Sequence, residues 1–330
     1  MGNNMQIIDG NTFFALTQTF EYVPFTQSEG WWAMNSAGNT ENRFVFFADD
    51  LSKPQIACMG RTTRKFGLKM LSIEGECLLR ENLTDSRIIR NFYREIAQTD
   101  SDIFEVNSSL KYNMLYEIGI REAGYLRPVG LFSTALTILF DLQKPIVYDK
   151  NWQKNLRKAG KYYLDFKAVS QPTEKDLSDY FTIHSQMRAH KKFGENWSLE
   201  MLKKLFLDKK FQLFLVENQE KERIAGLITF VRNNVATSIF SATSLEGRKK
   251  SASYFLFDKT FKACAKNGIL HYDHGRISPA AHKKNDIFLF KDGAKGEYVQ
   301  YCGEFSFYKK QIYRLLMYFV KKYLIKRVEV

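Results

Sequence analysis

The chain has 330 residues, of which 45% are hydrophobic and 15% aromatic, and its formal net charge at neutral pH is +13. This composition excludes a chain that is disordered over most of its length, because there is enough apolar material to build a core. The basic excess favours anionic partners such as nucleic acids, phosphorylated substrates or acidic membrane surfaces. The plainer alternative is a basic, well-solvated surface without a specific partner.

The cysteines and the chain start give hints about compartment. Cys58, Cys77, Cys264 and Cys302 are widely separated and form no C-x-x-C pair, so neither a zinc site nor a disulfide framework is indicated. No secretory signal is visible, and no apolar run approaches the roughly 20 residues that cross a bilayer. The sequence therefore predicts a cytoplasmic protein that uses neither a metal nor a cofactor.

The first half of the chain alternates strands and helices. Hydrophobic patterns predict strands over 44–48, 102–106 and 134–141, and helices over 85–97 and 112–123. Such alternation is typical of α/β architecture.

The second half begins with a basic helix over 150–161 and repeats this plan. A capping-box pattern at Thr173 and Asp176 starts one helix, and Ser198 starts another. Three strands follow over 211–217, 224–232 and 235–242, the last two joined by a tight turn at 233–234. A basic loop (247–251) leads into a helix over 252–266, and a strand over 269–273 precedes a loop and a closing strand. The pattern favours a duplicated α/β unit.

A C-terminal helix is predicted over 308–328. One face is apolar, and its members are Ile312, Leu315, Leu316, Phe319, Val320, Tyr323 and Leu324. We expect this face to pack on the core and the basic face to be solvated. The alternative is that the basic face holds an anionic polymer or a membrane headgroup.

The second half contains, in order, the segments FLVENQEKERIAGLITF, SATSLEGRKKSASYFLFDKTFKACAKNGILHYDHG and FLFKDGAKGEYVQYCGEF. This ordered set resembles the Fem-type (FemABX) peptidyltransferases. The last segment resembles the family's F-K-x-G signature and the acidic strand that follows it. Upstream, PFTQSEGWW resembles the Q-S-x-x-W motif, LRPVGLFSTALTILFDLQK the strand closing the first domain, and NWQKNLRKAGK the basic helix after it.

The resemblance implies two GNAT-like domains with mixed sheets, the first formed by 1–147 plus 308–330 and the second by 148–307. It implies that the C-terminal helix packs back on the first domain. It also implies transfer of an amino acid from aminoacyl-tRNA to an amine of a phosphate-bearing peptidoglycan precursor, with peripheral membrane association as a further possibility. One position departs from the family pattern: Asn35 stands where relatives carry a lysine that helps to hold the precursor's phosphates.

The resemblance makes Lys291 and Glu304 the candidate catalytic pair. Lys291 would pair with a phosphate or a developing oxyanion, and its plain alternative is a solvated lysine in a turn. Gly293 and Gly296 would let the backbone approach a ligand. Glu304 would anchor the incoming ammonium or accept its proton, or else form a salt bridge at a strand end. Asp273 is an alternative base, or a cap of the loop backbone.

Further candidates would bind substrate. Arg188 suits a diphosphate or a peptide carboxylate, or a surface ion pair, and Tyr254 would line the acceptor cleft or pack in the core. Arg248 and Lys249 precede a helix N-terminus that favours anions. Trp31 belongs to the Q-S-x-x-W motif, beside Asn35. The predicted substrate-binding residues are therefore Arg188, Tyr254, Trp31, Asn35, Arg248 and Lys249.

Two other functions stay open. One is a coenzyme A-dependent N-acyltransferase on the same fold, although only Gly247 remains of the glycine-rich loop that holds the coenzyme A pyrophosphate in GNAT acetyltransferases. The other is a non-catalytic scaffold that binds RNA or membrane.

Overall fold

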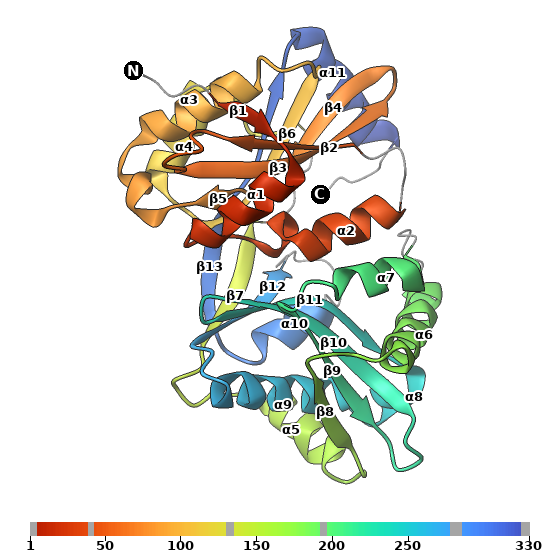
Figure 1. The fold of residues 1–330 in the computed structure, drawn as a ribbon. Coiled ribbons are helices and arrows are strands. Elements are labelled where there is room, and N and C mark those ends of the chain that lie inside the picture. The colour runs from red at the N-terminus through yellow and green to blue at the C-terminus, as the bar shows by residue number, and fades with distance from the viewer. Residues whose placement is uncertain (1–4, 39–42, 130–134, 192–196, 278–285, 325–330) are drawn as a thin grey trace. The chain divides into compact units, whose positions relative to one another are not determined.

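The computed structural model describes residues 5–38, 43–129, 135–191, 197–277 and 286–324. They form two compact units (Figure 1). Unit 1 comprises Met1–Trp32, Asn39–Leu136 and Val299–Val330, and unit 2 comprises Ala33–Gly38 and Thr137–Tyr298. The chain changes unit within β7 (Leu136–Asp141) and again within β13 (Glu297–Tyr308). These changes fall at 136/137 and 298/299, whereas the sequence placed its boundaries at 147/148 and 307/308.

Unit 1 contains a mixed sheet in the order β1-β2-β3-β4-β6-β13, with β5 paired to β3. β4 and β6 run parallel, and β6 and β13 run antiparallel. The strands are β1 (Gln6–Ile8), β2 (Arg43–Ala48), β3 (Ile56–Lys65), β4 (Leu68–Ile73), β5 (Cys77–Leu78), β6 (Ile103–Lys111) and β13. The helices are α1 (Gly10–Leu16), α2 (Glu29–Gly38), which runs on into unit 2, α3 (Ser86–Ile96), α4 (Met114–Glu122) and α11 (Gln311–Phe319).

The main core of unit 1 lies between its sheet and the helices α3 and α4 (Figure 1). α3 contributes Ile89, Phe92 and Tyr93, and the sheet contributes Leu71 and Phe104, all of them buried. A second cluster packs α1 and its neighbours through Phe13 and Phe46. α11 packs on β4 and β6, where Met317 contacts the group that contains Met70 and Ile103. The C-terminal helix therefore belongs to the first unit, as predicted.

Unit 2 contains a second sheet in the order β7-β12-β11-β10-β9-β8. β11 and β12 are parallel, and the pairs from β11 to β8 are antiparallel. The strands are β7, β8 (Asp165–Val169), β9 (Phe211–Glu217), β10 (Arg223–Arg232), β11 (Val235–Thr243) and β12 (His271–Ile277). The helices are α5 (Lys150–Ala159), α6 (Glu174–Lys191), α7 (Leu199–Leu205), α8 (Leu245–Lys249), α9 (Ala252–Lys266) and α10 (Asp286–Asp292). The mixed α/β class and the two sheets agree with the sequence.

Local signals in the sequence place many element ends correctly. Asp85 accepts the N–H of Arg87 at the start of α3. Thr173 and Asp176 exchange the two bonds of a capping box at the start of α6. Asn233 and Asn234 both take positive φ in the β10–β11 turn, as tight hairpin turns require.

Several predicted elements differ from the structure, among them the following two. The aromatic run at 288–290, which was expected between a polar loop and glycine-containing turns and not in a helix, lies in the helix α10. The C-terminal helix was predicted over 308–328, but Tyr308 ends β13, and α11 covers Gln311–Phe319 before a π-helical turn at Val320–Leu324. Residues 325–328 lie outside the described part.

Candidate functional site

The candidate site of unit 2 lies where two parallel strands stop pairing. β11 and β12 are in register only from Val235↔His271 to Thr237↔Asp273. Both strands then continue, β11 to Thr243 and β12 to Ile277. Strand edges that no longer pair with each other present N–H and C=O groups, and such edges are common peptide-binding positions. The divergence begins at Ser238 and His274.

Lys291 projects to this point of divergence from the last turn of α10. Its Nζ donates a hydrogen bond of 2.9 Å to the carbonyl oxygen of Arg276 on β12. A Cβ atom at Gly275 would lie 3.4 Å from that Nζ and 3.1 Å from the carbonyl oxygen of Ser238. Gly275 also has φ +78°, a conformation that glycine adopts readily. Glycine therefore leaves room for both the ammonium and the β11 carbonyl.

The surroundings of Lys291 change its acidity. Burial lowers the pKa of its ammonium to about 8, and the charge of Asp273 acts in the opposite direction. Asp273 accepts the N–H of Gly275 at 2.8 Å and the hydroxyl of Thr137. Lys291 is therefore not a solvated turn lysine. Asp273 was expected at a strand end but lies inside β12. Its carboxylate binds the backbone N–H of Gly275, which is the capping role given above as the alternative to a base.

His274 lies behind Lys291, fully buried among aromatic rings. Its ring centroid is 4.7 Å from that of Phe257 and 5.9 Å from that of Phe290. Neither ring nitrogen has a hydrogen-bond partner within the described part of the chain. Burial, and then the charge of Lys291, lower the pKa of His274 well below its usual range. The imidazole is therefore neutral at physiological pH.

The Phe-Lys-x-Gly sequence has a packing explanation. The indole N–H of Trp152 donates to the carbonyl oxygen of Phe290 at 2.6 Å, and the two rings lie 5.0 Å apart. A Cβ atom at Gly293 would lie 2.3 Å from Cδ1 of Trp152. At Gly296 it would lie 2.6 Å from Cγ2 of Ile138. These glycines make room for protein groups rather than for a ligand, which corrects the sequence interpretation.

Tyr254 packs in the same aromatic cluster as Trp152 and Phe290. Its ring meets Trp152 edge to face at 5.0 Å and Phe290 at 4.9 Å, and burial raises the pKa of its hydroxyl. Asp149 closes the arrangement, since its N–H donates to the carbonyl oxygen of Gly293 while its carboxylate caps α5 at Trp152. The start of α5 thus holds the end of α10, and with it Lys291, in place.

Arg188 lies on α6 near an aromatic group that reaches β11. Its charge, after burial, helps to lower the pKa of His184 to about 4. His184 stacks on Trp197 at 4.7 Å, and Trp197 meets Phe240 of β11 edge to face at 3.9 Å. Phe240 lies two residues beyond Ser238. The aromatic group beside Arg188 and the residues around Lys291 therefore both lie against β11, the strand that diverges from β12.

The predicted basic loop is a short helix. Arg248 and Lys249 lie in the last turn of α8, and Lys250 pairs with Glu246 at 2.6 Å. Gly247 is buried, and a Cβ atom there would lie 2.4 Å from the carbonyl oxygen of Ile224. Its role is close packing on β10, so it is not part of an open glycine-rich loop.

Three further candidates lie on α2 and β13. Trp31 packs edge to face on Phe25 at 5.0 Å, beside the N-terminal aromatic cluster. Asn35 is half-buried four residues later on α2. Glu304 lies on β13 in unit 1, opposite Asn107. Lys291 lies in unit 2, so the predicted catalytic pair is divided between the two units.

The Q-S-x-x-W residues have structural roles of their own. The side chain of Gln27 is fully buried, accepts the N–H of Met59 at 2.5 Å and donates to its carbonyl oxygen at 3.1 Å. Ser28 accepts the N–H of Trp31 at 3.2 Å at the start of α2. The motif thus attaches α2 to β3.

Sequence reasoning missed Arg127. Its guanidinium donates to the carbonyl oxygens of Cys302 at 2.7 Å and Glu304 at 3.1 Å, and it forms an ion pair with Glu117. It also lies 3.9 Å over the ring of Phe305. Arg127 therefore fixes the stretch of β13 that carries Glu304. The segment LRPVG gave the only signal, a lone arginine ahead of a strand.

Sequence reasoning also missed a buried acid in unit 1. Glu76 is fully buried and accepts the hydroxyl of Ser108 at 2.7 Å and that of Tyr93 at 3.3 Å. Burial raises the pKa of this carboxyl to about 7, and the hydroxyl hydrogen bonds oppose the rise. No basic side chain among the described residues forms an ion pair with it.

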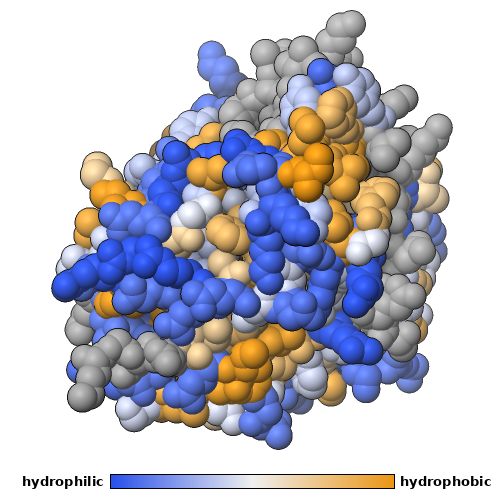
Figure 2. All heavy atoms as spheres, turned by 90° about the horizontal axis from the view of Figure 1, so that it is seen from above, coloured by the Kyte–Doolittle hydropathy of each residue, from blue (hydrophilic) through white to orange (hydrophobic). Residues whose placement is uncertain are grey.

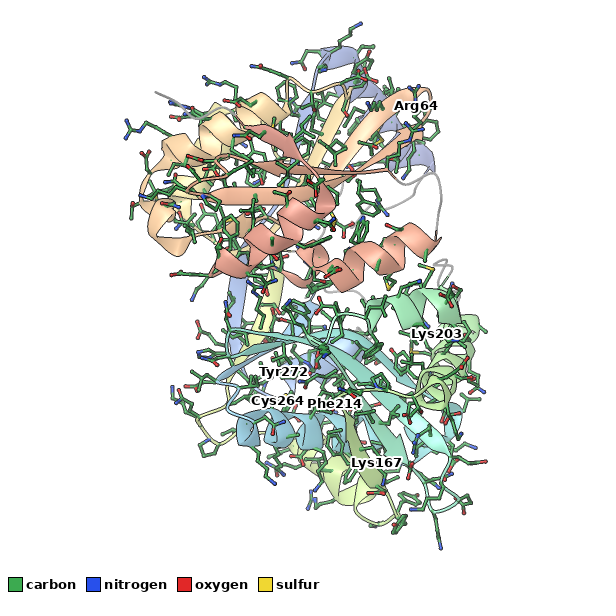
Figure 3. The ribbon with its side chains drawn as sticks, in the orientation of Figure 1. Arg64, Lys167, Lys203, Phe214, Cys264 and Tyr272 are labelled. Atoms are coloured by element: carbon green, nitrogen blue, oxygen red, sulfur yellow. The ribbon has the colours of Figure 1, made fainter. Side chains whose placement is uncertain are left out.

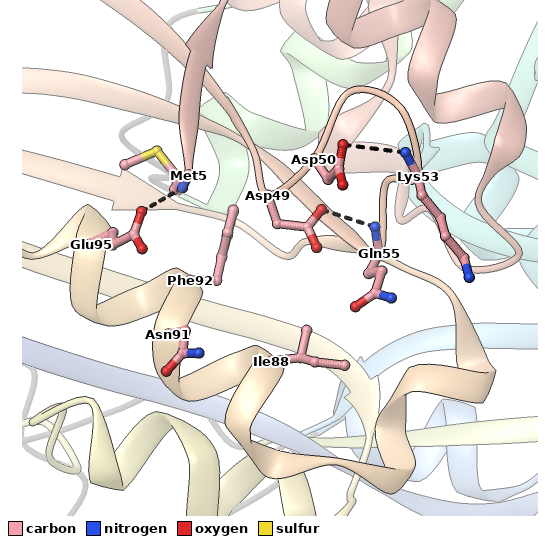
Figure 4. A pocket seen from close by; sticks show the side chains of 9 residues that line it. All are labelled: Met5, Asp49, Asp50, Lys53, Gln55, Ile88, Asn91, Phe92 and Glu95. Carbon is pink, nitrogen blue, oxygen red and sulfur yellow. Dashed lines mark hydrogen bonds between the residues drawn. The ribbon is translucent and has the colours of Figure 1, made fainter. Parts of the chain in front are cut away.

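Unit 1 also has a pocket of about 240 Å³ beside α3 (Figure 4). Asp49, Asp50, Lys53 and Glu95 are among the residues that line it, and Glu95 accepts the N–H of Met5. None of the residues predicted from the sequence to act in catalysis or binding lines this pocket. Elsewhere in the described residues, no group of His, Cys, Asp or Glu is arranged to hold a metal, and no helix among them is long and apolar enough to cross a membrane.

Comparison with known proteins identifies the family. The model of the FemAB family matches residues 148–322, a range that includes the diverging strands and Lys291. The chain belongs to the FemAB family. It is accordingly a transferase of the acyltransferase type. No curated protein matches it in sequence.

Solved structures of FemAB-like and related proteins share the fold. "Crystal structure of FemX" is 12% identical and covers 96% of this chain and 100% of its own, with a TM-score of 0.75. L-PGS from Bacillus licheniformis is 13% identical over 97% of both chains, with a TM-score of 0.61. The C-terminal domain of a putative lysylphosphatidylglycerol synthetase from Agrobacterium fabrum is 11% identical, covers 89% of this chain and 91% of its own, and has a TM-score of 0.59. At these identities the likeness concerns the fold.

Proposed function

We propose that this FemAB protein moves an amino acid from aminoacyl-tRNA to an amine of a peptidoglycan precursor. The family supports acyl transfer to such an acceptor, and the net charge of +13 suits two anionic substrates. The observation that carries the proposal is the partly desolvated ammonium of Lys291 where β11 and β12 diverge. A fixed cation in a water-poor site stabilises a developing negative charge more strongly than one in bulk water.

The reaction assigned to this site is aminolysis of an ester. The neutral acceptor amine attacks the aminoacyl carbonyl, a C–N bond forms, and the carbonyl oxygen becomes an oxyanion beside the Lys291 ammonium. The ester C–O bond then breaks, and the proton lost by the amine passes to the departing ester oxygen of the tRNA, which becomes a hydroxyl. The edges of β11 and β12, beyond the point where these strands stop pairing with each other, would hold the extended aminoacyl group in line for attack. Arg188, which lies in unit 2 as Lys291 does, would bind a phosphate or carboxylate of the acceptor.

A transfer assay tests the proposal. Charged tRNA and acyl-coenzyme A are offered in separate reactions with an extracted precursor pool, and mass spectrometry identifies the adduct. Because neighbours of this fold include a putative lysylphosphatidylglycerol synthetase, phosphatidylglycerol is offered as a competing acceptor. We expect an aminoacylated precursor from charged tRNA alone. Transfer from acyl-coenzyme A, or transfer to the lipid alone, would replace the proposal, and transfer from neither donor would favour the scaffold.

A matched pair of variants tests the site. Lys291→Met keeps the length of the side chain but removes the charge, and we expect kcat to fall about 100- to 1,000-fold while tRNA binding is retained. Lys295→Met removes an exposed cation four residues away that pairs with Asp292, and we expect it to leave kcat unchanged. Full activity in Lys291→Met would exclude Lys291 from the chemistry.

A further inference from the structure

α11 has two apolar faces, and among the residues that the structure describes only one of them is covered. Tyr313 and Met317 pack against the group of unit 1 that contains Met70 and Ile103, and Met317 and Val320 are almost fully buried. The second face consists of Ile312, Leu315, Leu316 and Phe319 of α11 and of Tyr323 in the π-helical turn that follows, and their exposed fractions run from 38% to 61%. Their spacing of three and four residues puts them in one stripe along the helix. This stripe is the larger part of the face that the sequence predicted to lie against the core.

The β3–β4 hairpin carries a further exposed aromatic residue. Phe66, at the tip of the β3–β4 hairpin, is 62% exposed with φ +54°. Leu68, two residues further on, packs against the group that contains Met317 of α11. Arg64 on the same hairpin is labelled in Figure 3. Figure 2 looks down on the side where α11 lies in Figure 1 and shows hydrophobic residues gathered among hydrophilic ones.

Basic side chains surround these apolar groups. Lys309, Lys310 and Lys322 on or next to α11 are exposed, as are Arg64 and Lys65 on the hairpin. The nearby acids are already engaged: Asp100 pairs with Lys69, and Glu105 pairs with Lys321. The surface thus combines large apolar side chains with a net positive border, and we call it the α11 surface.

We propose that the α11 surface docks on a lipid bilayer that carries anionic headgroups. Apolar and aromatic side chains enter the boundary between headgroups and acyl chains, while lysines and arginines pair with lipid phosphates. The positive charge of the α11 surface favours an anionic bilayer over a second copy of the chain. A symmetric dimer through this surface would bring like charges together around the apolar stripe. The proposal does not depend on the proposed reaction, since it requires neither a donor nor a precursor.

Vesicle sedimentation tests the docking. The full chain is mixed with vesicles of phosphatidylcholine alone and with vesicles that also contain phosphatidylglycerol. We expect binding to the anionic vesicles that weakens with salt, and at least about tenfold weaker binding for Leu315→Ser/Phe319→Ser. The control Tyr163→Ser/Leu207→Ser removes two residues of unit 2 that are 56% and 69% exposed, and it should bind like the unchanged chain.

Two further measurements separate the occupants. In Phe319→Trp, the added fluorescence should shift to shorter wavelength with anionic vesicles and be quenched by brominated lipid. Lys310→Glu/Lys322→Glu should lose anionic binding while it keeps its folded circular dichroism spectrum. Equal binding by the serine variant and the unchanged chain would overturn the proposal. So would sedimentation equilibrium that shows a dimer which the serine substitutions dissociate, because the surface would then belong to a second copy.

Discussion

Lys291 shows how one side chain acquires its chemistry from its neighbours. The ammonium lies where burial disfavours charge, and the charge of Asp273 only partly offsets that effect on its pKa. With its pKa at about 8, the group is mostly charged at neutral pH but can release a proton under mildly alkaline conditions. A lysine with an ordinary pKa would offer the same cation, but its charge would not change in this pH range.

The pH dependence of the reaction should report this lysine. If the ammonium is required, kcat falls as pH rises through about 8, because the folded protein loses that proton there. Lys291→Arg keeps a charge at every accessible pH, so its slower reaction should lack the alkaline decline. The measurement is kcat against pH with donor-ester hydrolysis subtracted, and Lys295→Met serves as control. A rate that keeps climbing well above pH 8 in the unchanged chain would contradict this role.

Among the elements, α10 depends on its surroundings more than on its own sequence. It has seven residues, too few for a stable helix in isolation. Trp152 and Asp149 of the α5 start bind its C-terminal end, and its ring at Phe290 packs beside Tyr254 and His274. The orientation of Lys291 is therefore set by α5, an element far away in the sequence.

Gly293→Ala should disturb this contact. The added methyl group would lie 2.3 Å from the Trp152 ring, which is fully buried and cannot move aside freely. We expect a loss of about 1–3 kcal/mol in the free energy of unfolding and a larger fall in kcat than stability alone explains. Urea unfolding and the transfer assay measure both. Gly160→Ala, where the added atom meets only ordinary contacts, should change neither.

The sequence predicted elements well where the signal is local. Asp85, Thr173 and Asn233 act within a few residues of themselves, so their caps and turn could be read directly. α10 could not, because residues 287–290 form a short continuous apolar run, which periodicity alone does not assign to a helix or a strand. The periodicity of α11 revealed an apolar helix but not that part of its apolar surface stays uncovered.

The site was predictable to a similar degree. The resemblance pointed to Lys291, and the structure places it beside Asp273 and His274. Arg127 could not be found from the sequence, because its partners are carbonyl oxygens of Cys302 and Glu304 on a strand distant in the chain. Side chains that bind backbone leave no residue pattern behind.

At the scale of the molecule, Glu76 should make the stability of unit 1 depend on pH. The folded pKa of about 7 lies above the ordinary value of 4.5, so the folded state holds the proton more tightly. Its contribution is complete below pH 4.5 and is lost as pH rises to about 7, a change of about 3 kcal/mol.

Glu76→Gln should remove this dependence. Its stability relative to the unchanged chain should increase from pH 5 to pH 7 and then level off, as measured by urea unfolding across that range. Glu74→Gln, two residues away and with a side chain that is 45% exposed, is the matched control. A Glu76→Gln advantage that does not vary with pH would show that Glu76 is not a buried titrating acid.

The insertion of unit 2 within unit 1 has a consequence for synthesis on the ribosome. β6 emerges early, yet its partner β13 is translated only after the whole stretch Thr137–Tyr298. Unit 2 can therefore complete its folding first. Until β13 has been synthesised, the edge of β6 that later pairs with it lacks this partner. Nascent chains should be most prone to misassociation during this interval, and chaperone engagement would be concentrated there.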